Sequence, residues 1–193
     1  MNFPSIYLAS QSPRRRELLT QMGVPFSSLS VDVDESHLAN ETPLDYVQRV
    51  ALAKAQAGLA SLNNVDERPV LGSDTSVVVD DDILGKPRDE HHGAEMLKKL
   101  SNRSHQVITA VAIVTNSQVW TSTSISTVSF AALSDDDIAW YIATQEGVDK
   151  AGGYAVQGLA ALFIDNIEGS YSGIMGLPIR QTGLLLRQIV APT

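Results

Sequence analysis

The sequence places one acidic residue where a reacting water could lose its proton. Asp74 lies in the segment 72–75 (Gly-Ser-Asp-Thr), directly after a predicted buried strand. A carboxylate at a strand end, where the active sites of α/β sheets gather, can hold a divalent metal or accept a proton from water. Taken alone, the residue is equally well explained as a turn aspartate that accepts hydrogen bonds from local backbone amides.

Basic and hydroxyl side chains cluster in the segment 10–16 (Ser-Gln-Ser-Pro-Arg-Arg-Arg), between a predicted strand and a predicted helix. The free amides of a helix N-terminus, together with the guanidinium groups of Arg14 and Arg15, form a natural site for an anion such as phosphate. Without other evidence, a solvated basic turn with an ordinary N-cap is the better explanation.

Three further charged residues could complete such a site. Glu35 can carry magnesium, while Lys54 and Lys86 can neutralise phosphate oxygens. Phosphoryl transfer requires this division of labour between carboxylates and cations. Each of the three residues, considered separately, is more simply an exposed charge on a loop or helix.

Two loops have compositions that favour contact with a ligand. In the segment 85–88 (Gly-Lys-Pro-Arg), Pro87 fixes the backbone beside Lys86 and removes a donor. The glycine-rich segment 150–158 can admit a ligand close to its backbone, and Gln157 offers both a donor and an acceptor that can read the polar edge of a pyrimidine. A plain loop is the simpler explanation for each segment alone.

The periodicity of apolar residues predicts the elements that must position these side chains. Strands are expected at 6–9, 26–33, 69–72 leading into 76–79, 83–84, 106–115, 119–133 and 159–167. Helices are expected at 14–22, from 42 onward, at 90–100, at 134–145 and at 178–190. Ser12 fits the N-cap of the first helix, Pro13 its first turn and Gly23 its C-terminal stop.

The alternation of strands and helices predicts an α/β protein with a mixed, twisted sheet flanked by helices. The chain has 193 residues and contains neither an internal repeat nor a long linker. We therefore expect one domain, 1–193, that is two-lobed and has a cleft.

The composition excludes several classes of function. With 14 Lys+Arg against 22 Asp+Glu, the formal net charge is −8, which argues against a nucleic-acid polymer as partner. The absence of cysteine excludes disulfides, thiolate nucleophiles and cysteine-ligated zinc. No P-loop, dinucleotide-binding or zincin motif is present, and the four histidines are not spaced as a metal cluster.

Apolar runs are too short for a membrane span, and the N-terminal basic residues follow the first apolar stretch instead of preceding it. The sequence therefore predicts a cytoplasmic protein without a membrane partner.

Together the segments resemble the Maf family of nucleoside-triphosphate pyrophosphatases. The matching stretches run in order along almost the whole chain: 8–15, 34–35, 50–57, 72–75, 85–88, 149–154, 157–158, 169–171 and 176–178. Gln11 departs from the family pattern, in which a small residue is common. The segment 154–158 (Tyr-Ala-Val-Gln-Gly) resembles the branch that acts on dTTP and UTP, and differs from the 7-methyl-GTP branch.

The resemblance implies a Maf/ITPase-like fold and cleavage of a nucleoside triphosphate between its α and β phosphates. It implies that Asp74 is the proton acceptor and that Arg14, Thr75 and Gln157 are specificity positions. Ser10, Arg15, Glu35, Lys54 and Lys86 would complete the phosphate and metal environment. The expected cofactor is Mg²⁺ or Mn²⁺, held by Glu35 and Asp74.

Several alternatives stay open at this point. The substrate could be 7-methyl-GTP or a modified pyrimidine nucleotide, and the family's association with septum inhibition leaves room for a cell-division regulator that works through protein contacts. The sequence does not settle the oligomeric state, and a homodimer is one candidate.

Overall fold

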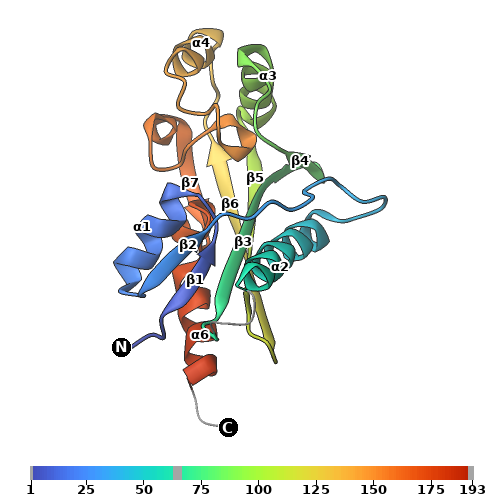
Figure 1. The fold of residues 1–193 in the computed structure, drawn as a ribbon. Helices are drawn as coiled ribbons and strands as arrows, with labels where there is room; N and C mark the ends of the chain where they lie inside the picture. Colours follow the sequence, from blue (N-terminus) through green and yellow to red (C-terminus); the bar gives the residue numbers. More distant parts are fainter. Residues whose placement is uncertain (1, 63–66, 191–193) are drawn as a thin grey trace.

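The computed structural model describes residues 2–62 and 67–190. Figure 1 shows an elongated molecule in which α3 and α4 lie at one end of the sheet and α6 extends toward the other. The elements in chain order are β1 (Ile6–Ala9), α1 (Pro13–Met22), β2 (Phe26–Leu29), α2 (Pro43–Ser61), β3 (Val70–Val79), β4 (Asp82–Leu84), α3 (Glu90–Leu100), β5 (Ser104–Val114), β6 (Val119–Phe130), α4 (Asp135–Ala143), η1 (Ala151–Gly153), η2 (Leu159–Phe163), β7 (Ile164–Glu168), α5 (Tyr171–Ile174) and α6 (Ile179–Val190).

The strands form one mixed sheet in the order β2-β1-β3-β5-β6-β7, with the short β4 paired to β3. β1 is parallel to both β2 and β3, while β3, β5, β6 and β7 are antiparallel to their neighbours. The chain passes from β1 to one side through α1 and returns to the other side through α2. The strand order therefore reverses between β1 and β3, which is where ligands bind in open α/β sheets.

Alternating side chains of the strands divide the core between the two faces of the sheet. Ile6 and Leu8 of β1 pack with α1 and α6, whereas Ala9 packs with α2 on the opposite face. A third cluster, which includes Val77, Val107 and Phe130, lies under α3 and α4. The expected α/β class, with a mixed sheet flanked by helices, is confirmed.

The helix ends follow the local signals in the sequence. Ser12 occupies the N-cap position of α1, Pro13 begins the helix, and Gly23 ends it in the left-handed conformation with φ of 70°. The Thr42 side chain accepts a hydrogen bond from the Asp45 amide at the start of α2, and Ser134 with Asp137 forms a complete capping box at the start of α4.

Four strand predictions are wrong in extent, and one of these is the strand expected at 119–133, which ends at Phe130 as β6. The expected break in the strand at Asp74 does not occur, because β5 pairs with β3 from Val70 to Val78. Asp74 is thus inside a strand and not at its end. β2 stops at Leu29, and 159–163 is a 3₁₀ helix that precedes β7.

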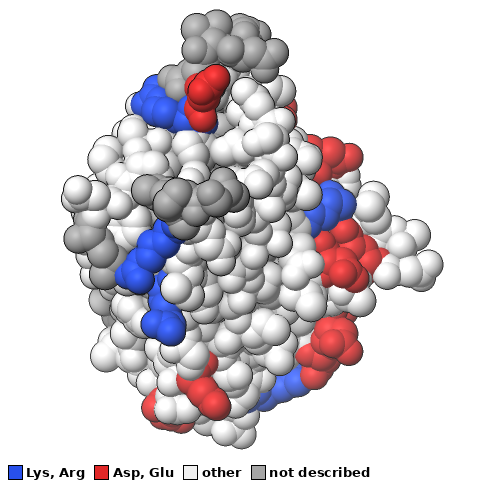
Figure 2. All heavy atoms as spheres, turned by 90° about the horizontal axis from the view of Figure 1, so that it is seen from below, with Lys and Arg blue, Asp and Glu red and all other residues white. Residues whose placement is uncertain are grey.

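Figure 2 shows the molecule from below, where basic side chains lie singly or beside acidic ones and uncharged surface separates them. Among the described residues on this face, no broad basic surface of the kind that binds a nucleic-acid polymer is present. Across residues 2–62 and 67–190, no helix has the length and apolar character needed to cross a membrane.

Candidate active site

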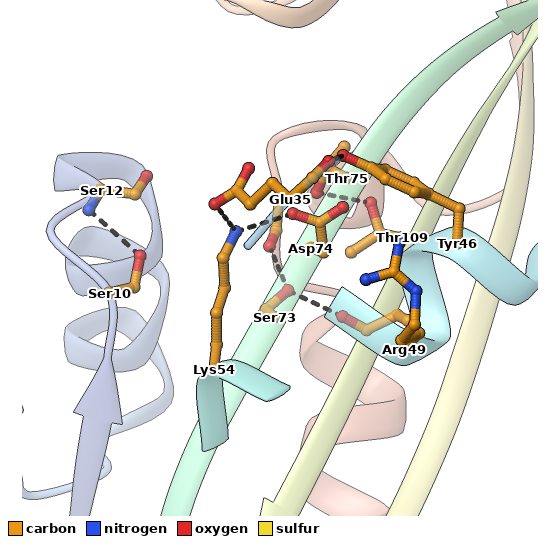
Figure 3. Close-up of polar contacts among 12 residues, drawn as sticks. Ser10, Ser12, Glu35, Tyr46, Arg49, Lys54, Ser73, Asp74, Thr75 and Thr109 are labelled. Atoms are coloured by element: carbon orange, nitrogen blue, oxygen red, sulfur yellow. Dashed lines mark hydrogen bonds and ion pairs between the residues drawn. The ribbon is translucent and has the colours of Figure 1, made fainter. Parts of the chain in front are cut away.

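Two carboxylates and one ammonium group meet beside β3. Lys54 Nζ on α2 lies 2.8 Å from Asp74 Oδ1 and 2.8 Å from Glu35 Oε1. Asp74 is buried, with 6% of its surface exposed, while the Glu35 side chain is half exposed. Figure 3 shows Glu35 and Asp74 converging on Lys54. The predicted proton acceptor and two predicted phosphate or metal residues therefore form one group, which we call the Asp74 cluster.

A glycine on β3 allows α2 to bring Lys54 to this position. A Cβ at Gly72 would lie 2.3 Å from the Ala51 carbonyl oxygen and 2.6 Å from the Ala55 amide nitrogen, both on α2. A side chain at position 72 would therefore push the helix away from the strand. Lys54 follows Ala51 by three residues, so the close approach of the backbones sets its distance from Asp74.

Burial and the neighbouring positive charges act on the pKa of Asp74 in opposite directions. Burial raises the pKa of Asp74 above its ordinary value, and Lys54 and then Arg15 act against that shift. A carboxylate with a raised pKa is a better proton acceptor at neutral pH than an exposed one. Lys54 donates to Oδ1, and among the described residues no donor reaches Oδ2. That second oxygen is available to a water.

Arg15 lies on the other face of β3, since Thr75 points away from Asp74. Its Nε donates to the Gly176 carbonyl at 2.9 Å, and its two terminal nitrogens approach Ser10 Oγ at 3.2 Å and Thr75 Oγ1 at 3.4 Å. Burial lowers the pKa of Arg15, while Asp74 and Glu35 raise it. An arginine remains charged in either case, so a positive group is fixed opposite the cluster.

Both groups lie where one edge of β3 has no strand beside it. β1 pairs with β3 only at Val70 and Leu71, and β4 pairs with it only from Val77 to Val79. Between these points β5 is the one strand partner that the described residues provide. Side chains from both faces of β3 can reach a ligand at this open edge, which is at the reversal of strand order.

Two residues of α2 that the sequence analysis did not select hold the loop that carries Glu35. Tyr46 donates its hydroxyl proton to the Glu35 carbonyl at 2.9 Å, and Arg49 donates to the Ser36 carbonyl at 2.9 Å. Arg49 also binds both carboxylate oxygens of Glu41, at 2.5 and 2.8 Å, and lowers the pKa of Glu41 to about 2. Burial, with Asp74 and Glu35, raises the pKa of Tyr46 to about 12.

Three predicted site residues are joined by no hydrogen bond or ion pair, among the described residues, to the Asp74 cluster or to Arg15 and its partners. Arg14 pairs with Glu17 on the surface of α1 at 3.2 Å. Lys86 is exposed after β4, where its charge acts on Asp149. Gln157 is exposed between η1 and η2.

Two residues missed by the sequence analysis contact predicted site residues directly: Tyr46 binds the Glu35 carbonyl, and Thr109 contacts Thr75. Arg49 binds the carbonyl of Ser36 beside Glu35, and Ser73 shares the Gly176 carbonyl with Arg15. Tyr46 precedes Lys54 by eight residues, which places both on the same side of a helix, and this spacing was an available signal. Thr109 gives no such signal, because only the pairing of β3 with β5 places it opposite Thr75.

The Asp74 cluster fits a divalent cation in part. No group of three or more His, Asp or Glu side chains converges within the described ranges. Two carboxylates do converge, however, since Glu35 and Asp74 share the ammonium group of Lys54. Magnesium is commonly bound by one or two carboxylates together with substrate phosphates and water, and Glu35 and Asp74 provide that number of carboxylates.

Comparison with known proteins gives consistent matches over nearly the whole chain. The family model described as "Maf-like protein" matches residues 5–189. A dTTP/UTP pyrophosphatase from Pseudoalteromonas translucida is 51% identical, over 95% of this chain and 96% of that protein. Proteins of the same name from Aliivibrio fischeri and Shigella dysenteriae are 49% and 46% identical, over 96% and 94% of this chain and 98% and 91% of theirs.

Proposed function

The chain belongs to the Maf family, and we propose that it hydrolyses dTTP and UTP to the nucleoside monophosphate and pyrophosphate. The similarity to three dTTP/UTP pyrophosphatases over more than nine tenths of each chain supports this substrate class. Modified pyrimidine nucleotides belong to the same proposed class. We also propose a cytoplasmic setting for the protein.

The observation that carries the proposal is the Asp74 cluster at the open edge of β3, with Arg15 on the opposite face. A triphosphate bound there would meet a proton acceptor and fixed positive charges at once. Transfer of a phosphoryl or nucleotidyl group depends mainly on such positioning and charge stabilisation.

In the proposed reaction, a water oxygen attacks the α-phosphorus while Asp74 accepts the water proton at Oδ2. The new bond joins that oxygen to the α-phosphorus, and the bond from the α-phosphorus to the α–β bridging oxygen breaks. Pyrophosphate leaves with the bonding electrons. Lys54 and Arg15 stabilise the added negative charge, and Lys54 keeps Asp74 ionised before the attack.

The remaining predicted residues have proposed binding roles. The amides at the start of α1, with Ser10, favour phosphate oxygens. We assign Lys86 to the leaving pyrophosphate, and Arg14, Thr75 and Gln157 to recognition of the nucleoside. Glu35 and Asp74 would hold Mg²⁺ or Mn²⁺, which when bound neutralises phosphate charge and polarises the α-phosphate.

The test is pyrophosphate release from dTTP, UTP, CTP and 7-methyl-GTP, measured with the full chain, with added Mg²⁺ and with a chelator. We expect dTTP and UTP to be hydrolysed fastest and only in the presence of metal. Hydrolysis of 7-methyl-GTP alone would contradict the proposed substrates, and no hydrolysis of any of the four would contradict the enzymatic function.

A further inference from the structure

Thr109 is a fully buried hydroxyl on β5 that faces the predicted specificity residue Thr75. Its exposed fraction is 0%, and the two threonines are directly opposite in the strand pairing. Thr109 Oγ1 lies 2.9 Å from Thr75 Oγ1 and 2.8 Å from the Gly173 carbonyl oxygen. Thr109 thus links Thr75 to the backbone of α5.

The chemistry of these groups fixes the direction of both hydrogen bonds. A carbonyl oxygen can only accept, so the single hydroxyl proton of Thr109 is directed to Gly173. Thr109 Oγ1 lies within donor distance of both oxygens but has only one proton. We therefore assign the proton between the two threonines to Thr75, with Thr109 as its acceptor. This is the one arrangement in which each hydroxyl donates one full hydrogen bond.

Arg15 occupies one of the two lone pairs of the Thr75 hydroxyl oxygen. A guanidinium group can only donate, so Thr75 Oγ1 accepts from Arg15 Nη2 at 3.4 Å. Thr75 has therefore committed its proton to Thr109 and one lone pair to Arg15. Its second lone pair remains, and Thr75 is only partly buried. Toward a ligand the hydroxyl is an acceptor and not a donor.

The hydroxyl of Thr109 is not required for packing of the strand. Val107 and Val111, two residues away on either side, point to the same face of β5 and are buried apolar side chains. Valine has the shape of threonine and would fill the same space. The polar atom at position 109 is therefore explained by its two hydrogen bonds.

We propose that Thr109 is a positioning residue that holds the Thr75 hydroxyl as an acceptor, so that the site selects a nucleotide with a hydrogen-bond donor at that point. The inference rests on the proposed function, since it concerns recognition of the nucleoside. A thymidine nucleotide has two such donors, the N3–H of the base and the 3′-hydroxyl of the sugar. Phosphate oxygens and the base carbonyls have none.

The test compares dTTP with two analogues that each lack one donor, N3-methyl-dTTP and 3′-deoxythymidine triphosphate. The ratio of kcat/KM for dTTP over each analogue is measured for the wild type, Thr109→Val and Thr109→Ser. We expect one of the two ratios to fall by about tenfold in Thr109→Val, mainly through KM for dTTP, and to be retained in Thr109→Ser. The analogue affected identifies the donor.

A double-mutant cycle separates this role from a purely structural one. In a Thr75→Val background the oxygen that Thr109 orients is absent, so Thr109→Val should leave the ratio unchanged. A structural defect would lower kcat/KM equally in both backgrounds. Thermal unfolding checks that each variant is folded, and Thr109→Ala replaces Thr109→Val if the valine variant does not fold.

Two results would overturn the inference. One is a folded Thr109→Val enzyme with both ratios within about twofold of the wild type. The other is an equal change of ratio in the Thr75→Val background. Failure of the proposed function looks different, because the wild-type protein would then release no pyrophosphate from dTTP.

Discussion

The Asp74–Lys54 pair and the His105–Tyr154 pair each join a buried polar side chain of a central strand to a residue outside the sheet, but they are constructed in opposite ways. Asp74 and Lys54 are oppositely charged groups 2.8 Å apart, and the same lysine reaches the half-exposed Glu35. His105 Nε2 and the Tyr154 hydroxyl are 2.7 Å apart, and Phe130 packs edge-on against both rings.

Burial acts on the two pairs in different directions. It raises the pKa of Asp74, but Lys54 and Arg15 oppose the shift and favour the ionised form. It lowers the pKa of His105 to about 4 and raises that of Tyr154, so both of those groups stay neutral. His105 Nδ1 has no hydrogen-bond partner among the described residues.

The difference predicts which of the two pairs acts in catalysis. Burying charges costs free energy, and a hydrophobic pair is often as stable as a buried ion pair. The charged pair lies at an open strand edge, where a ligand can use it, whereas the neutral pair lies inside an aromatic cluster. We therefore expect changes at Asp74 and Lys54 to alter turnover, and changes at His105 and Tyr154 to alter stability.

Asp74→Asn should have the largest effect, a loss of about 10³-fold in kcat, or about 4 kcal/mol, because the amide cannot accept the water proton. Thermal unfolding should show no loss of stability, since a buried charge has been removed. Asp82→Asn, which changes an exposed partner of Lys99, is the matched control and should retain activity. A folded Asp74→Asn enzyme with full turnover would disprove the catalytic role.

The protein should lose stability in acid because of His105. The pKa of the His105 imidazole is about 4 in the folded protein and 6.5 in the unfolded chain, so the unfolded state binds the proton first as the pH falls. The contribution is fully present above pH 6.5 and falls by about 3 kcal/mol as the pH drops to about 4. Urea unfolding from pH 7.5 to 4 measures it as the difference between wild type and His105→Phe. If the free energy of unfolding changes equally with pH in the two proteins, His105 is not the source of the acid sensitivity.

Lys54→Met should lower kcat/KM by about 100-fold, or about 2.7 kcal/mol, because a cation beside the reacting phosphate is lost. Lys54 also lowers the pKa of Asp74, so its removal raises that pKa further. The acid limb of the pH–rate profile should consequently move to higher pH. Lys99→Met, at an exposed ion pair, is the matched control. If the acid limb does not move, the group whose titration it reports is not Asp74.

Tyr154→Phe should have the smallest effect, a loss of about 1 kcal/mol of stability from one buried hydrogen bond. The ring still packs against Phe130, and kcat/KM for dTTP should stay within about twofold. Thermal unfolding and steady-state kinetics on the same preparation measure both quantities. A large loss of activity with unchanged stability would reverse the assignment of this region.

Local signals predict the helix ends well. Glu90–Leu100 is observed with the expected bounds, and the capping residues Thr42 and Ser134 bind the amides that their spacing implies. These features depend on hydrogen bonds within a few residues, so the sequence contains the information. The extent of β3 depends instead on its pairing with β5, which is distant in the sequence and places Ala110 opposite Asp74, and the strand therefore continues through Asp74.

In the candidate site, too, residues with local signals can be predicted and residues placed by long-range pairing cannot. Residue type and resemblance indicate Glu35, Lys54 and Asp74, and the fold brings all three together. Thr109 has no local motif, because its role comes from strand register and from the direction of a shared proton. Residues that position others are recognised only when the partners are seen together.

The most direct test of the account follows the oxygen of the attacking water. Wild-type enzyme and Asp74→Asn are incubated with dTTP and Mg²⁺ in ¹⁸O-labelled water, and both products are analysed by mass spectrometry. Attack at the α-phosphorus predicts one labelled oxygen in dTMP and none in the pyrophosphate, with the labelling rate reduced about 10³-fold in Asp74→Asn. Label in the pyrophosphate, or an unchanged rate in the variant, would contradict the account.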